Sequence, residues 1–121
     1  MDEIIELHEQ IKTLTEERRY KELKAILSEA NAIDIAEALN DLPENCMRMA
    51  FRLLGKDQAA DAFVAMGHEE QESLIRSFTD KELVAIVEDL SVDDAVDIIG
   101  EMPANVVARI LRSADAQTRK S

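Results

Sequence analysis

Acidic residues dominate one stretch of the chain, between Asp80 and Glu101. Lys81 is the only base in this stretch, and the acids are Asp80, Glu82, Glu88, Asp89, Asp93, Asp94, Asp97 and Glu101. Carboxylate oxygens are ligands for hard divalent cations, and Mg²⁺ often uses only one or two of them while keeping much of its water. Charge alone therefore leaves two interpretations open: a cation-binding surface, or a solvated face that keeps the domain soluble.

Three of these acids are spaced to lie along one side of a helix. Within the stretch L-S-V-D-D-A-V-D-I-I-G-E-M-P at 90–103, Asp93, Asp97 and Glu101 follow one another at intervals of four. Side chains at this spacing are neighbours, and like charges there cost about a few tenths of a kcal/mol per pair. Asp93 and Asp94 recover part of that cost because the helix dipole favours anions at the N-terminus. Their oxygens, with those of Asp97 and Glu101, are the candidate metal ligands.

The elements that position this row belong to a repeat with a period of 12 residues. The units are 20–31, 32–43, 44–55, 56–67, 68–79, 80–91, 92–103 and 104–115. Positions 4, 7, 8 and 11 of each unit are apolar, and Gln71 is the single polar exception. This spacing is typical of one face of a helix. Position 12 holds a turn or cap residue: Asn31, Pro43, Gly55, Gly67, Thr79, Ser91, Pro103 or Asp115.

A helix this short cannot bury its apolar stripe alone, whereas stacked neighbours bury a continuous one. The sequence therefore predicts an all-α fold, an α-solenoid of short helices of about ten residues that repeat every 12 residues. Residues 1–19 are predicted to form a separate N-terminal helix, and residues 20–115 the helical repeat domain. Phe51 and Phe63, which share position 8, are expected to pack in one core region.

The junctions between units carry cap chemistry. Thr79 precedes Glu82 by three residues, which predicts a capping box, and Ser91 precedes Asp94 in the same way. Gly55 and Gly67 are expected to adopt the left-handed conformation that often occurs at the end of a helix.

Composition excludes several classes of function. The formal net charge is −12 and aromatic residues make up 3% of the 121 residues, which disfavours nucleic acid as a partner. The single cysteine, Cys46, excludes an internal disulfide and makes a structural zinc site unfavourable. No apolar run approaches the ~18 residues of a membrane span, and the first residues lack the basic start and apolar core that are typical of a signal peptide. We therefore expect a cytoplasmic domain. His8 and His68 form no catalytic constellation, so we do not expect an enzyme.

The 12-residue units, and above all residues 90–103, resemble the cytoplasmic N-terminal domain of MgtE-type magnesium transporters. That family has a recurring L-x-x-D-D-A-A-D-L-L-x-x-L-P element, which Leu90, Asp93, Asp94, Ala95, Asp97, Ile98, Ile99 and Pro103 match. Val96 and Met102 are apolar replacements. The resemblance covers about residues 20–115. It implies a right-handed superhelix at the cytoplasmic face of the membrane, with residues 116–121 as a linker towards a CBS domain.

The resemblance further implies a sensor of intracellular Mg²⁺. In the family, Mg²⁺ bridges this domain to CBS domains and the pore closes, whereas at low Mg²⁺ the acidic faces repel. The partners would be the CBS domains and membrane channel of the same full-length protein, a homodimer. Asp93 and Asp97 match the metal-facing acids, Asp94 is adjacent, and Asp61 occupies the same unit position as Asp97. Weak Mg²⁺ binding by the isolated domain is expected, because the facing acids lie outside it.

The alternative is a helical scaffold for protein–protein interaction, either like the stacked helices of flagellar motor-switch proteins or as a free-standing adaptor. The two hypotheses predict different continuations of the gene beyond Ser121: CBS domains and apolar spans favour the sensor, and a stop codon counts against it.

Overall fold

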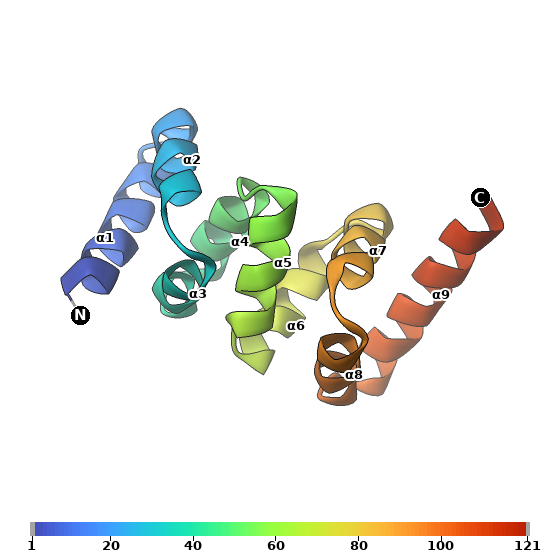
Figure 1. Ribbon diagram of the computed structural model, residues 1–121. Coiled ribbons are helices and arrows are strands. Elements are labelled where there is room, and N and C mark those ends of the chain that lie inside the picture. Colours follow the sequence, from blue (N-terminus) through green and yellow to red (C-terminus); the bar gives the residue numbers. More distant parts are fainter. Residues whose placement is uncertain (1, 121) are drawn as a thin grey trace. The chain divides into compact units, whose positions relative to one another are not determined.

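The computed structural model describes the backbone of residues 2–120 and the side chains of residues 6–115. In this part of the chain, α-helices joined by short turns form the whole fold and no strand occurs (Figure 1). The helices are α1 (Asp2–Glu16), α2 (Tyr20–Glu29), α3 (Ala32–Asn40), α4 (Glu44–Arg52), α5 (Lys56–Ala65), α6 (His68–Ser77), α7 (Asp80–Asp89), α8 (Val92–Gly100) and α9 (Ala104–Lys120). The predicted all-α fold class is confirmed.

The helices keep the register of the repeat. Each helix from α2 to α9 begins at the first residue of a 12-residue unit, from Tyr20 to Ala104. Helices α2 to α8 contain nine or ten residues, as the period predicts. Helix α9 is longer and ends at Lys120, so residues 116–120 of the predicted linker are helical. That linker remains a prediction.

Two predicted caps are present. The Thr79 hydroxyl accepts a hydrogen bond from the Glu82 amide at 3.1 Å, and the Glu82 carboxylate accepts one from the Thr79 amide at 2.9 Å. This pair is a complete capping box. The Ser91 hydroxyl accepts from the Asp94 amide at 3.1 Å. Both hydroxyls accept from a first-turn amide that has no partner within its helix. This explains why α7 and α8 begin where they do.

The prediction for the glycines was wrong. Gly55 (φ −67°, ψ 162°) and Gly67 (φ −71°, ψ 160°) are extended residues at the N-termini of α5 and α6. The chain enters the next helix directly from an extended residue, so the turn needs no left-handed glycine. The left-handed position belongs to Arg18 (φ 58°), after α1. There the Arg19 amide bonds to the Leu14 carbonyl at 2.9 Å, and the Arg18 amide to that of Thr15 at 3.2 Å, the pattern of a Schellman motif.

Contacts divide the chain into two compact units, residues 1–66 and 67–121. In the first unit α3 lies against α5 and α1, and α1 also contacts α2 and α4. Its core contains Ile11, Leu23, Leu27, Ile35, Leu39 and the ring pair Phe51 and Phe63. The two rings meet edge to face with centroids 6.2 Å apart, which confirms their predicted packing.

In the second unit, residues 67–121, α9 lies against α7 and also contacts α6. Its core contains Leu74, Ile75, Leu83, Ile98 and Ile110. Gln71, the polar exception in the repeat, is also buried, and its Oε1 lies 2.9 Å from His68 Nδ1. The hydrogen bond offsets the cost of placing an amide at an apolar position.

Each unit contains a long side chain that bonds to the end of an earlier helix. The Gln58 amide donates to the carbonyls of Leu27 and Ala30 at 2.7 and 2.8 Å, at the end of α2. The Arg109 guanidinium donates to the Ile75 carbonyl at 2.6 Å, near the end of α6, and also pairs with Asp80 at 3.1 Å. The last carbonyls of a helix lack partners within it, so these bonds satisfy them.

Burial alternates at position 5 from α2 to α7, whereas Val96 in α8 and Ala108 in α9 are both exposed. In α3, α5 and α7 this position is apolar and buried: Ala36 is 2% exposed, Ala60 6% and Val84 8%. In α2, α4 and α6 the same position holds Lys24, Arg48 and Glu72, none of which is buried. From α2 to α7 the helices therefore come in pairs, and the second helix of each pair has the wider buried face. The charged residues are tolerated at position 5 of α2, α4 and α6 because their charges remain hydrated there.

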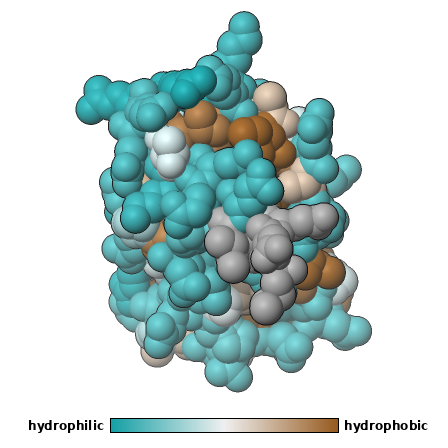
Figure 2. Space-filling model, turned by 90° about the vertical axis from the view of Figure 1, so that its left-hand side faces the viewer, coloured by the Kyte–Doolittle hydropathy of each residue, from teal (hydrophilic) through white to brown (hydrophobic). Residues whose placement is uncertain are grey.

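The face on the α1 side is largely hydrophilic, and apolar atoms reach the surface only in patches (Figure 2). Within the first unit, Leu14 and Ile26 contribute to a shallow pocket of about 300 Å³, which Glu9, Gln10, Thr13 and Glu22 also line. Glu22 pairs with Arg19. These patches are small enough to be ordinary for a folded domain.

Candidate metal-binding surface on helix α8

Helix α8 lies near the surface of its unit and carries the acidic row. It begins after the Ser91 cap and ends at Glu101 (φ −96°, ψ 0°). Ile98 is the one buried residue between Val92 and Gly100. Most of the helix surface is therefore available to solvent or to a partner.

The acidic row is solvent-exposed along its length. Asp93, Asp97 and Glu101 are all exposed, and Asp94 is half-buried beside the Ser91 cap. Within residues 6–115, none of the ion pairs found involves Asp93, Asp97 or Glu101. The structure thus places Asp93 and Asp97 on α8 and Glu101 at its C-cap, without a neutralising base. Such a row attracts cations.

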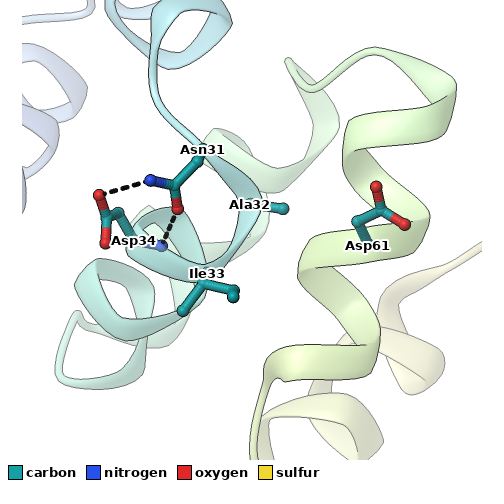
Figure 3. A pocket seen from close by; sticks show the side chains of 5 residues that line it. All are labelled: Asn31, Ala32, Ile33, Asp34 and Asp61. Carbon is teal, nitrogen blue, oxygen red and sulfur yellow. Dashed lines mark hydrogen bonds between the residues drawn. The ribbon is translucent and has the colours of Figure 1, made fainter.

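Asp61 lies in the other unit, on α5, where its exposed side chain lines a shallow pocket of about 450 Å³. The remaining lining comes from Asn31, Ala32, Ile33 and Asp34 in the turn before α3 and its first turn (Figure 3). Asn31 caps α3: its Oδ1 accepts from the Asp34 amide and its Nδ2 donates to the Asp34 carboxylate, both at 2.9 Å. The structure therefore places Asp61 beside the start of α3, with the Asp34 carboxylate turned toward Asn31, and a place for Asp61 beside the α8 row stays a prediction.

Asp34 was not among the predicted site residues. The signal for it was present in the sequence, because Asn31 precedes Asp34 by three residues, as Ser91 precedes Asp94. That spacing marks a helix start and puts an acid in the first turn. What the sequence lacked was the neighbouring helix, since only the packing of α3 on α5 places Asp61 across from it.

Among the described side chains, no group of three or more His, Cys, Asp or Glu residues converges to hold a metal ion. The donor chemistry of the α8 row nevertheless fits Mg²⁺, which prefers oxygen ligands and often needs only one or two carboxylates. The row can supply that number from Asp93 and Asp97. Further ligands would have to come from water or from a second surface.

Other reactive side chains serve the fold. Cys46 is buried in α4, and that burial, reinforced by the charge of Glu16, raises the pKa of its thiol. A raised pKa keeps the thiol protonated and weakly nucleophilic at neutral pH. His8 Nδ1 lies 2.9 Å from the Ala38 carbonyl and so ties α1 to α3. Both residues therefore have a structural role within the first unit.

The chain is thus an all-α domain of short helices, and one of them, α8, carries an exposed row of acids. The family model of the MgtE intracellular N domain matches residues 30–121. This chain belongs to that family, as the DD-x-x-D element predicted, and the family is that of the N-terminal domain of a magnesium transporter. No curated protein matches the chain. None of the described helices is both long and apolar enough to cross a membrane.

Proposed function

We propose that this domain is the regulatory, non-enzymatic part of a magnesium transporter, where it senses Mg²⁺ through the exposed acidic face of α8. The observation that carries the proposal is the row of Asp93, Asp97 and Glu101, exposed and without ion-pair partners in residues 6–115. Membership of the MgtE N-domain family supplies the transporter context.

The row suits a sensor because its electrostatic energy depends on bound cations. Three unneutralised carboxylates on one helix face repel any second acidic surface. Mg²⁺ between the two surfaces replaces repulsion with shared coordination, in which Asp93 and Asp97 supply oxygens and water completes the shell. The second surface in this proposal belongs to CBS domains of the same protein, on the cytoplasmic face of the membrane. Docking then closes the pore, and loss of Mg²⁺ releases the domain.

Sharing the site between two surfaces also explains how such a sensor can respond to abundant Mg²⁺. Two carboxylates on one exposed helix bind weakly, because water competes effectively and no further ligand is held in place. Affinity rises only when the second surface adds its own oxygens. Binding and docking are then the same event, which converts a change in Mg²⁺ concentration into a conformational change.

The gene provides the first test. If codons beyond Ser121 encode CBS domains and several membrane spans, the sensor hypothesis gains the parts that it needs. A stop codon after Ser121 would contradict it.

The second test is Asp93→Ala/Asp97→Ala in the full-length dimeric transporter. We expect normal folding and a loss of Mg²⁺-dependent closure, measured as ion flux in proteoliposomes over a range of Mg²⁺ concentrations. Asp57→Ala/Glu69→Ala is the matched control, because both residues are exposed acids in the first turns of other helices. Closure that is unchanged in the Asp93/Asp97 variant, or equally reduced in the control, would exclude these residues as ligands.

A further inference from the structure

We draw no further inference here: the strongest candidate, the shallow pocket of about 450 Å³ that Asp61 on α5 shares with the start of α3, rests on two aspartates beside the exposed Ile33, and nothing in the structure shows what covers it.

Discussion

Helices α3 and α8 have similar sequences and different environments. Both contain nine residues, and both begin with a side-chain cap that accepts an amide hydrogen bond three residues later. Yet α3 buries Ile35, Ala36, Ala38 and Leu39, and α8 buries only Ile98. At position 5 the smaller Ala36 is 2% exposed and the larger Val96 is 65% exposed. Apolar character alone therefore does not determine burial, as Ala108 also shows, since it is exposed at position 5 of α9.

The difference has a functional meaning. Helix α3 uses its apolar residues for contacts with α5 and α1 inside its unit. Helix α8 keeps two of its own at the surface, next to unneutralised acids. A helix of the second kind gains little stability for its domain from those residues.

The largest expected difference in stability comes from placing a lysine at position 5 of α3 and, separately, of α8. Ala36→Lys should lower the free energy of unfolding by about 3 kcal/mol or more, because it puts a charge and extra volume into a filled interior. Val96→Lys should change it by less than about 0.5 kcal/mol, because the side chain stays in water and Lys24 already occupies this position in α2. Urea denaturation of the two variants measures both values. Similar losses would show that α3 and α8 are equally buried.

Removal of the N-terminal caps is expected to cause a smaller loss of stability, of equal size in α3 and α8. Asn31→Ala and Ser91→Ala should each cost about 1 kcal/mol, because each leaves an amide of the first turn without its acceptor. The control is Ser28→Ala, which removes an exposed hydroxyl that bonds only within its own helix and is expected to be nearly neutral. Thermal unfolding measured by circular dichroism provides the comparison. A loss of stability in Asn31→Ala but not in Ser91→Ala would show that the N-terminus of α8 is frayed.

The smallest effect concerns charge repulsion on α8. Asp97→Asn should raise stability by about 0.3 kcal/mol at low salt, because it removes one member of two like-charged pairs four residues apart. The gain should fade as salt or Mg²⁺ is added, since both screen the remaining acids. Glu37→Gln at the same position of α3 is the comparison: Ile33 lies four residues before Glu37 and Asp41 four residues after it, so the change removes only one such pair and should gain about half as much. A gain in Asp97→Asn that persists in high salt would contradict repulsion as its cause.

Much of the fold was predictable from the sequence because it depends on local rules. The start of each helix was visible in the 12-residue period, and the Thr79 and Ser91 caps were visible in single spacings. The glycine prediction failed because Gly55 and Gly67 enter the next helix from extended backbone, and the left-handed residue is Arg18 instead. The alternation at position 5 was missed because it depends on contacts such as α3 with α5, between residues far apart in the chain.

The candidate site was predictable to the same extent. The spacing of Asp93, Asp97 and Glu101 placed them on one helix face, and the structure leaves that face exposed. The neighbours of Asp61 could not be read from the sequence, because only the packing of α3 on α5 brings it into one pocket with the start of α3. The exposure of Val92 and Val96 was also hidden, since apolar residues in a helix predict burial until the neighbours are known.

The bonds that Gln58 and Arg109 make to earlier helix ends have a consequence for how the chain opens. Each bond joins helices within a single unit, α5 to α2 in residues 1–66 and α9 to α6 in residues 67–121. Opening one such bond exposes carbonyls at a distant helix end, so the helices of a unit should lose protection from hydrogen exchange together. Amides of Leu27 and Ala62 would then exchange at one common rate, and those of Leu74 and Ile110 at another. The domain would behave as two folding units in a chain of repeats that looks uniform.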